Sequence, residues 1–212
     1  MAGTLEPPAD HVLRTLDDLA RHYGEANPRS LTKEIAYVNA PYRALIEASS
    51  FVILATAGPD GLDASPRGDP PGFVTVDEAG RTLFLPDRPG NNRVDSLRNI
   101  VSDPRVGLLF LVPGLGETLR VNGRATISVD PDLLSRFAMN GKRPRSVIRI
   151  EVESVYFQCQ KAIVRSRLWS ADAQAAKGTL PSAGTMLAAT DAATDAQTYD
   201  REAPARVAQT IY

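Results

Sequence analysis

Arginine and asparagine residues gather in the stretch LPDRPGNNRVDSLRNI, residues 85–100, which begins as a hydrophobic strand end and continues as an amphipathic helix. The pattern predicts that this helix begins at about Asn91 or Asn92 and ends near residue 101. Its free backbone N–H groups and the positive end of its dipole would then face a turn that carries Arg88 and Arg93. Such a turn could bind a phosphate group. Alternatively, the asparagine is only an N-cap and Arg88 only pairs with Asp87 or Asp95.

A second candidate lies in DASPRGDPPGF, residues 63–73. The alternation of a strand puts Ser65 and Arg67 on the same face, and the glycines and prolines that follow predict an irregular connection. Arg67 could bind a phosphate group or a ring edge. Its structural alternative is a salt bridge with Asp63 or Asp69.

A third candidate is QKAIVRSRLW, residues 160–169, in which Lys161, Arg165 and Trp169 recur at intervals of four residues. On a helix these side chains share one face, so they could offer two cations and an aromatic plane to a flat, phosphorylated ligand. The alternative is a solvated helix face that Trp169 anchors to the core.

Other kinds of site find little support in the sequence. The formal charge of −1 gives no general field for nucleic acid or an anionic membrane. His11 and His22 have no carboxylate or cysteine at metal-ligand spacing, and both are too close to the N-terminus for a Ser-His-Asp triad in the sheet. The basic stretch GKRPRSVIR, residues 141–149, lacks interleaved aromatics and is interpreted as a solvated loop.

The single cysteine, Cys159, excludes an intrachain disulfide and is expected to be a small buried hydrophobe. The N-terminus has no signal-peptide pattern, and no stretch approaches 18 uninterrupted apolar residues, so a cytoplasmic setting is expected.

The elements that must position these residues are mostly hairpin strands. Strands are predicted over 51–57, 62–66, 72–77, 81–86, 105–112, 117–129 and 146–159, with a bulge at the VNG of residues 121–123. Helices are predicted over 10–23 with Asp10 as a plausible cap, 30–38 with Ser30 as cap, 41–49, 91–101 and 131–139. Because the turns are too short for helical crossovers, the fold is expected to be mainly β, a small antiparallel barrel with accessory helices.

Three regions follow from this pattern. Residues 1–49 are expected to form a helical segment that packs on the barrel, and residues 50–170 the barrel itself. Residues 171–212 form an alanine-rich tail that cannot build a core of its own, with a short helix that Ser182 could cap.

The order of these pieces resembles a known family. FVILATAGPDGLDASPRGDPPGFV, then RTLFLPDRPGNNRVDSLRNIVSDPRVGLLFLVPGLGETLRVNGRATI, then QKAIVRSRLW are similar to a subgroup of the pyridoxamine 5′-phosphate oxidase-like, FMN-binding split β-barrel family, over about residues 30–190. The resemblance implies a six-stranded antiparallel split barrel that forms a homodimer. It also implies one FMN in each of two clefts at the subunit interface.

The resemblance further implies which residues bind the flavin. Arg67 would hold its phosphate together with Arg88, Asn92 and Arg93, and Trp169 would approach the flavin from the partner subunit. Four strand residues would lie along the isoalloxazine ring: Phe84, Leu85, Phe110 and Leu111. With the candidates above, the predicted cofactor-binding residues are Ser65, Arg67, Phe84, Leu85, Arg88, Asn92, Arg93, Phe110, Leu111, Lys161, Arg165 and Trp169.

The activity implied is FMN-dependent oxidoreduction, with hydride transfer through flavin N5 to or from a small molecule. Arg120, or Arg165 from the partner, is a candidate to stabilise the reduced flavin, and Glu117 is a candidate base. Vitamin B6 oxidation itself is not expected, because Gly68-Asp69 stands where the true oxidases carry a lysine and the tail reads RVAQTIY. The alternatives are a split barrel that binds F420 or haem, and a flavin-binding protein without enzymatic activity.

Overall fold

The computed structural model describes residues 11–176 and 178–212 and divides the chain into two compact units, of which the first ends at Glu34. The described part of the first unit contains two short helices, α1 (Leu16–Tyr23) and α2 (Pro28–Thr32). Helix α1 begins later than predicted because the Thr15 hydroxyl accepts a hydrogen bond from the Asp18 N–H, and the Asp18 carboxylate accepts one from the Thr15 N–H. The predicted cap Asp10 lies outside the described residues.

Helix α2 replaces the predicted helix over 30–38, which is wrong. Asn27, not Ser30, caps α2 by accepting a hydrogen bond from the backbone two residues further on. The chain then becomes extended, because Ile35 exchanges two main-chain hydrogen bonds with Val155, of 3.1 and 2.8 Å.

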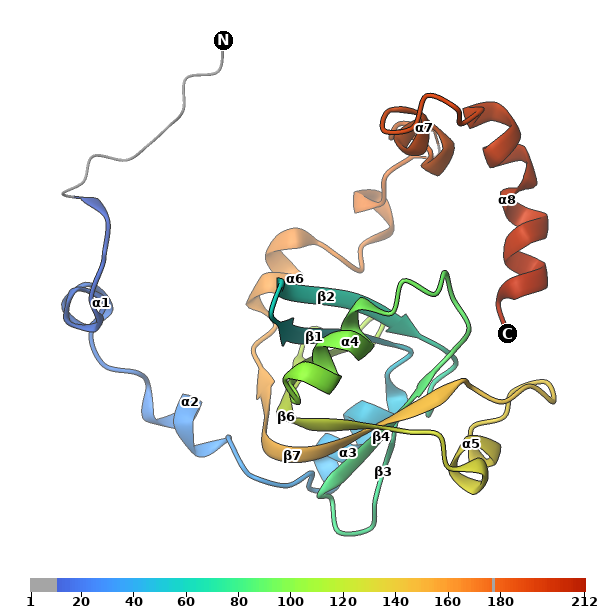
Figure 1. The fold of residues 1–212 in the computed structure, drawn as a ribbon. Coiled ribbons are helices and arrows are strands. Elements are labelled where there is room, and N and C mark those ends of the chain that lie inside the picture. The colour runs from blue at the N-terminus through green and yellow to red at the C-terminus, as the bar shows by residue number, and fades with distance from the viewer. Residues whose placement is uncertain (1–10, 177) are drawn as a thin grey trace. The chain divides into compact units, whose positions relative to one another are not determined.

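The second unit, residues 35–212, is built around one antiparallel sheet (Figure 1). Its strands are β1 (Phe51–Gly58), β2 (Gly61–Gly68), β3 (Thr75–Val76), β4 (Thr82–Asp87), β5 (Arg105–Leu111), β6 (Thr118–Ser128) and β7 (Ser146–Gln158). They lie in the order β2-β1-β5-β6-β7-β4-β3. The predicted mainly β, antiparallel fold with accessory helices is therefore confirmed.

The sheet has seven strands rather than six, and it does not close. The strand expected over 72–77 shrinks to Thr75–Val76, because Pro70 and Pro71 have no N–H to donate and Gly72 adopts a φ of +87°. Strand β2 pairs only with β1. Backbone hydrogen bonds therefore leave β2 unpaired along one edge, and the barrel is split there.

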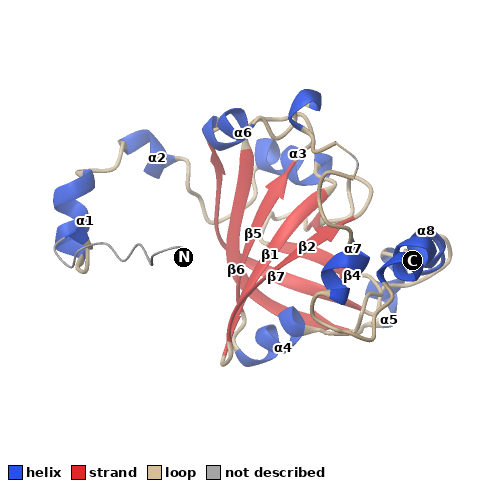
Figure 2. Ribbon diagram, turned by 90° about the horizontal axis from the view of Figure 1, so that it is seen from above, coloured by secondary structure: helices blue, strands red, loops and turns tan. Residues whose placement is uncertain are grey.

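Four helices accompany the sheet: α3 (Ala40–Ala48), α4 (Asp95–Ser102), α5 (Pro131–Arg136) and α6 (Lys161–Ser166). Figure 2 shows α4 at one end of the strands and α3 with α6 at the other. Helix α3 packs through Ile46, which is completely buried, and α4 packs through Ile100 and through a hydrogen bond of 3.0 Å from Asn99 Nδ2 to Thr56 Oγ1.

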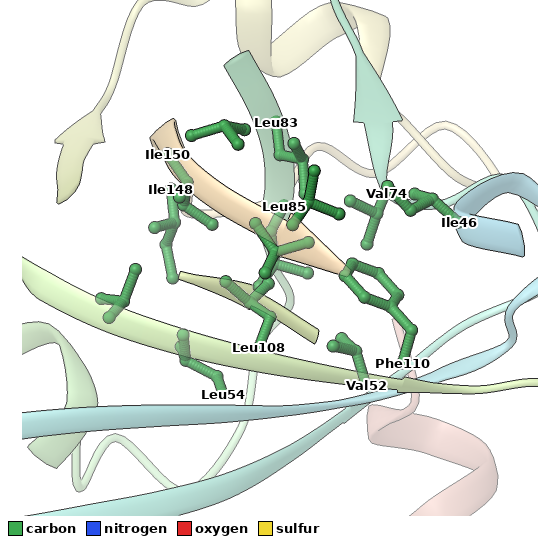
Figure 3. Packing of buried hydrophobic residues seen from close by; sticks show 14 of the residues in the cluster. Ile46, Val52, Leu54, Val74, Leu83, Leu85, Leu108, Phe110, Ile148 and Ile150 are labelled. Atoms are coloured by element: carbon green, nitrogen blue, oxygen red, sulfur yellow. The ribbon is translucent and has the colours of Figure 1, made fainter. Parts of the chain in front are cut away.

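The core lies between the inward faces of the strands (Figure 3). Because successive side chains of a strand point to opposite faces, alternate residues of each strand are buried. The largest fully buried side chains are Phe110, Ile46, Leu54, Leu83, Leu85, Leu108, Leu119, Ile148 and Ile150. The prediction of a buried Cys159 is wrong, because this residue follows the end of β7 and is exposed.

A β-bulge interrupts the pairing of β6 with β7 between Asn122 and Gly123, as predicted. A β-carbon on Gly123 would lie only 2.1 Å from the main-chain oxygen of Glu151. Only glycine therefore allows the two strands to approach so closely, and the bulge bends the sheet around the core.

The tail contains more helix than the single short one predicted. Helix α7 (Ala183–Ala188) has the predicted Ser182 cap, but α8 (Ala196–Thr210) was not expected. Asp195 caps α8, which carries Pro204 inside it and buries none of its residues. Of the helices described, none is both long and apolar enough to cross a membrane.

Candidate functional site

A cavity of about 420 Å³, here called the arginine cavity, lies at the split in the barrel. Strand β2, the loop between β4 and α4, and the start of β7 contribute its walls. The lining residues are Ser65, Pro66, Arg67, Asp87, Arg88, Gly90, Asn91, Asn92, Val94, Leu97, Arg145 and Ser146. The cavity thus brings together two of the three regions that the sequence singled out.

Arg67 crosses the split between β2 and β4. Its Nη1 lies 2.5 Å from Asp87 Oδ1, so it pairs with neither Asp63 nor Asp69 as the structural alternative expected. Its Nε donates to Ser65 Oγ at 3.3 Å. The side chain of Arg67 is 21% exposed and that of Asp87 12%, so the pair is shielded but open to a ligand.

Ser65 ties the same face of β2 to α4. Its Oγ lies 2.9 Å from Ser96 Oγ, and the Ser96 hydroxyl donates to Asp63 Oδ2 at 2.5 Å. Because Asp63, Ser65 and Arg67 alternate along one strand, all three point to this face. The inward face of β2 is therefore polar, unlike the inward faces of the core strands.

Arg88 is held from the other side of the cavity. Its Nε donates to Asp69 Oδ2 at 2.7 Å and its Nη1 donates to the main-chain oxygen of Phe137 at 2.6 Å. The sequence suggested Asp87 or Asp95 as partner, which is wrong because β2 brings Asp69, distant in sequence, beside the turn.

Helix α4 begins at Asp95, and the prediction of a start at Asn91 or Asn92 is wrong. Its N-cap, Val94, is left-handed with a φ of 53°, and no side chain caps the helix. An acidic residue therefore occupies the first turn, where the sequence suggested a bound phosphate.

Arg93 is separated from the arginine cavity by this arrangement. Its Nε pairs with the Asp95 carboxylate, which raises the pKa of Arg93, and its side chain is 79% exposed. Arg93 lines a neighbouring cavity of about 360 Å³ together with Asp60, Asp63 and Arg98. Of the predicted phosphate ligands, the structure thus brings Arg67, Arg88 and Asn92 together but not Arg93.

Two lining residues with hydrogen-bonding side chains, Arg145 and Ser146, were not among the sequence candidates, and the interpretation of residues 141–149 as a solvated loop is wrong from Ser146 onward, where the buried strand β7 begins. Arg145 Nη1 donates to Asn92 Oδ1 at 2.7 Å, and none of the ion pairs in the described chain involves Arg145. Ser146 is only 5% exposed, and its Oγ has no hydrogen-bond partner among the described residues. The signal that could have found them is their position at the junction between the basic loop and strand β7.

The charges of the arginine cavity favour an anion. Three arginines line it, and Asp87 and Asp69 pair with two of them, Arg67 and Arg88, which leaves a formal excess of one positive charge, that of Arg145. Planar guanidinium groups bind phosphate oxygens through paired hydrogen bonds, and a buried hydroxyl can add another. The arrangement therefore suits a phosphate monoester.

The residues expected along a flavin ring divide into two pairs. Leu85 and Phe110 point into the core, where they are 0% and 1% exposed, and Figure 3 shows both among the packed side chains. Only their main chains remain available to a ligand. Phe84 and Leu111 are half-buried on the opposite face of their strands and keep part of their side chains accessible.

Five further candidates lie away from the arginine cavity of their own chain: Glu117, Arg120, Lys161, Arg165 and Trp169. The predicted helical face is interrupted, because α6 ends at Ser166 and Arg167 is left-handed. Trp169 then turns back and donates from Nε1 to the main-chain oxygen of Leu115 at 2.7 Å. Arg120 Nη1 donates to Tyr156 Oη at 3.0 Å.

Comparisons with known proteins identify a family for this chain. The family model described as pyridoxamine 5′-phosphate oxidase matches residues 39–159. No curated protein matches the chain. Among solved structures, HupZ of Group A Streptococcus is 16% identical with a TM-score of 0.45, over 56% of this chain and 91% of that one. General Stress Protein 26 of Bacillus anthracis is 18% identical with a TM-score of 0.42, over 54% and 88%. Because the family model covers more than half of its length, this chain belongs to the pyridoxamine 5′-phosphate oxidase-like family.

Proposed function

We propose that the protein is an FMN-dependent oxidoreductase and that the arginine cavity holds the flavin phosphate. The observation that carries the proposal is Ser146, whose buried hydroxyl has no partner in the described chain and lines a cavity with an excess of positive charge. A buried hydroxyl without a hydrogen bond is costly, and a bound phosphate oxygen would satisfy it.

The residues that would hold the phosphate are already oriented. Asp87 fixes Arg67, and Asp69 fixes Arg88, so neither arginine must lose much rotamer freedom when a ligand binds. Arg145 has no carboxylate partner in the described chain and supplies the charge that the aspartates leave uncompensated. An anionic phosphate group therefore fits both the sign of the charge and the donor set.

The chemistry would come from the cofactor, and binding and orientation from the chain. Bound FMN would supply hydride transfer at its N5 atom, to or from a small molecule. Arg67, Arg88 and Arg145 would anchor it by the phosphate, far from the reacting ring. Pro66, Val94 and Leu97 give the cavity apolar walls that reduce the access of water.

We further propose that the protein is a homodimer in which the partner completes the flavin site. The outward faces of β2, β1 and β5 form a continuous apolar surface, made of Leu62, Ala64, Pro66, Phe51, Ile53, Ala55, Ala57, Gly107, Leu109 and Leu111. Leu62 is 89% exposed. A sheet with apolar residues on both faces needs cover on both, and a second copy could supply it.

The dimer would also give a place to residues that do not line the arginine cavity of their own chain. Trp169 could reach the flavin of the partner, as the family resemblance implies, and Arg165 is a further candidate to do so. Leu62→Asp should weaken the dimer, and sedimentation of the variant and of the wild type would measure this. An unchanged monomer in both would refute the dimer proposal but leave the phosphate site untouched.

The proposal is tested by flavin binding to matched arginine variants. The purified protein should show a two-band flavin spectrum, and FMN should bind the apo-protein. Arg145→Gln should raise the FMN Kd about tenfold or more, because it removes a hydrogen bond to a charged group. Arg149→Gln is the control, because Arg149 lies on β7 four residues after Arg145, pairs with Glu151 and does not line the cavity.

The outcomes separate the cofactors as well. An equal loss in both variants would mean that only net charge matters and would count against the site. A Soret band would identify haem as the cofactor instead of FMN. Tighter binding of F420 than of FMN would identify F420 instead.

A second candidate function is flavin binding without turnover. It is favoured by one observation: the sole carboxylate in the lining of the arginine cavity, Asp87, is already engaged by Arg67. A screen of flavin reduction by amines, reduced nicotinamides and reduced F420, followed by reoxidation with oxygen, distinguishes the two. Reduction by none of these donors would favour the binding protein.

A further inference from the structure

One residue of the tail, Tyr212, which follows α8, contacts residues at the arginine cavity. Its phenol donates a hydrogen bond of 2.6 Å to Asp69 Oδ1, while Arg88 Nε donates to the other oxygen of the same carboxylate at 2.7 Å. The ring of Tyr212 also lies 5.7 Å from the guanidinium carbon of Arg88. Lys142 Nζ donates to the main-chain oxygen of Tyr212 at 2.6 Å.

Asp69 is the link between Tyr212 and the arginine cavity. Its side chain is only 1% exposed, so both of its oxygens need hydrogen bonds from the protein. One is satisfied by Arg88, the other by the Tyr212 phenol. Loss of the phenol would leave a buried carboxylate oxygen short of a donor, and Asp69 would move or admit water.

Arg88 depends on this carboxylate for its orientation. In the described chain Asp69 is its only ion-pair partner, and the aromatic face of Tyr212 supports the cation from the side. The same guanidinium lines the arginine cavity. A change at Tyr212 is thus transmitted to a cavity residue through two direct contacts.

We infer that Tyr212 is a positioning residue for the arginine cavity. By docking on Asp69 and Arg88, it holds the Arg88 side chain toward the cavity. Docking of the segment 183–212 and binding of a phosphate-bearing ligand therefore favour each other. The inference rests on the phosphate site proposed above. Because such coupling is reciprocal, the factor by which docking tightens the ligand must equal the factor by which the ligand tightens docking.

Tyr212→Phe tests the inference, because it removes only the hydroxyl. Tyr199→Phe is the matched control: Tyr199 lies on α8 and packs against Arg206, with 4.1 Å between the guanidinium carbon and the ring centroid, within the tail itself. The hydrogen-exchange rate of the backbone amides of residues 183–211 measures docking of the tail. The Kd from a titration with FMN measures ligand binding in the arginine cavity. In the apo-protein, Tyr212→Phe should speed exchange of this segment about tenfold, the factor expected for a hydrogen bond to a charged group.

The FMN Kd of Tyr212→Phe should rise by about threefold or more, and that of Tyr199→Phe should not change. FMN should slow exchange of the segment in the wild type but not in Tyr212→Phe. Equal Kd values for wild type and Tyr212→Phe would overturn the inference.

Failure of the proposed function would look different. If the wild type does not bind FMN, the same titration with inorganic phosphate measures anion binding in the arginine cavity without a flavin. Protection of residues 183–211 by phosphate in the wild type alone would support the inference, and equal protection in both proteins, or in neither, would overturn it.

Discussion

Replacement of Ser146 by alanine should act in opposite directions on the apo-protein and on the ligand complex. The Ser146 hydroxyl is buried and has no hydrogen-bond partner in the described chain, so in the apo-protein it only costs free energy. An unsatisfied buried polar group costs about 1–3 kcal/mol. Alanine removes this cost but fits a strand less well, by about 0.5 kcal/mol. The free energy of unfolding should therefore rise by about 1.5 kcal/mol.

The expected shift is large enough to measure. For a protein of this size, about 1.5 kcal/mol corresponds to a rise in Tm of roughly 3–6 °C. With FMN the sign of the effect changes, because the variant loses a hydrogen bond to a charged phosphate. That loss, about 1.5–3 kcal/mol, should raise the FMN Kd roughly 10- to 150-fold.

Thermal melts with and without FMN give both numbers. At an FMN concentration of 100 times the wild-type Kd, the wild type gains about 2.7 kcal/mol, whereas a variant with a 30-fold weaker Kd gains only about 0.9 kcal/mol. The advantage of the variant in the apo-protein should therefore disappear in the complex.

Thr75→Val is the control for this experiment. Thr75 carries the other buried hydroxyl without a partner among the described residues, and it does not line the arginine cavity. Thr75→Val should stabilise the apo-protein and leave the FMN Kd unchanged. If Ser146→Ala makes the apo-protein less stable, the hydroxyl has a partner and the reasoning fails; if its FMN Kd is unchanged, Ser146 is no ligand.

Three further predictions concern other parts of the chain. Gly123→Ala should destabilise the protein by about 1–3 kcal/mol, seen as a lower urea midpoint with an unchanged slope, because the new β-carbon would lie 2.1 Å from a main-chain oxygen of β7. The pKa of Asp103 is lowered to about 2, chiefly by the hydrogen bond from the Arg105 side chain, so its stabilising effect is complete above its ordinary pKa of 3.8 and is lost as the pH falls through about 2. Carboxyl NMR should show this midpoint, and Arg105→Gln should raise it; no rise would contradict the assignment. The pKa of Tyr212 is raised above its ordinary value of 10.0, first by its hydrogen bond to Asp69, so docking of the tail is complete below pH 10 and weakens as the pH rises through the higher, folded-state pKa. The charged groups that face this phenol are Asp69 and Arg88. Hydrogen exchange corrected for its intrinsic pH dependence should show the weakening in the wild type and not in Tyr212→Phe.

The sequence predicted those features that depend on neighbouring residues. Hairpins, the bulge before Gly123 and the Ser182 cap follow from turn chemistry, bulge geometry and capping, which act over a few positions. The common face of Ser65 and Arg67 follows from strand alternation and places both in the arginine cavity.

The features that were missed depend on contacts between distant segments. Arg67 and Arg88 each had more than one aspartate near them in sequence, and only the approach of β2 to the turn after β4 selects Asp87 for Arg67 and Asp69 for Arg88. Helix α4 starts late because Val94 adopts a left-handed conformation that its side chain does not favour and that the surrounding loop imposes. In the sequence nothing distinguishes Ser146 from other serines at the start of a strand, because its burial depends on the fold around the paired strands β4 and β7.

The split in the barrel separates the hydrophobic core, which stabilises the fold, from the arginine cavity, which is proposed to bind the ligand. Strand β2 is joined to the turn after β4 by two ion pairs rather than by a ladder of main-chain hydrogen bonds. Side chains along this edge can therefore be exchanged without disturbing sheet register or core. In evolution, such an edge could accept new ligands while the fold stays the same, which is one physical reason why a single scaffold can diversify in what it binds.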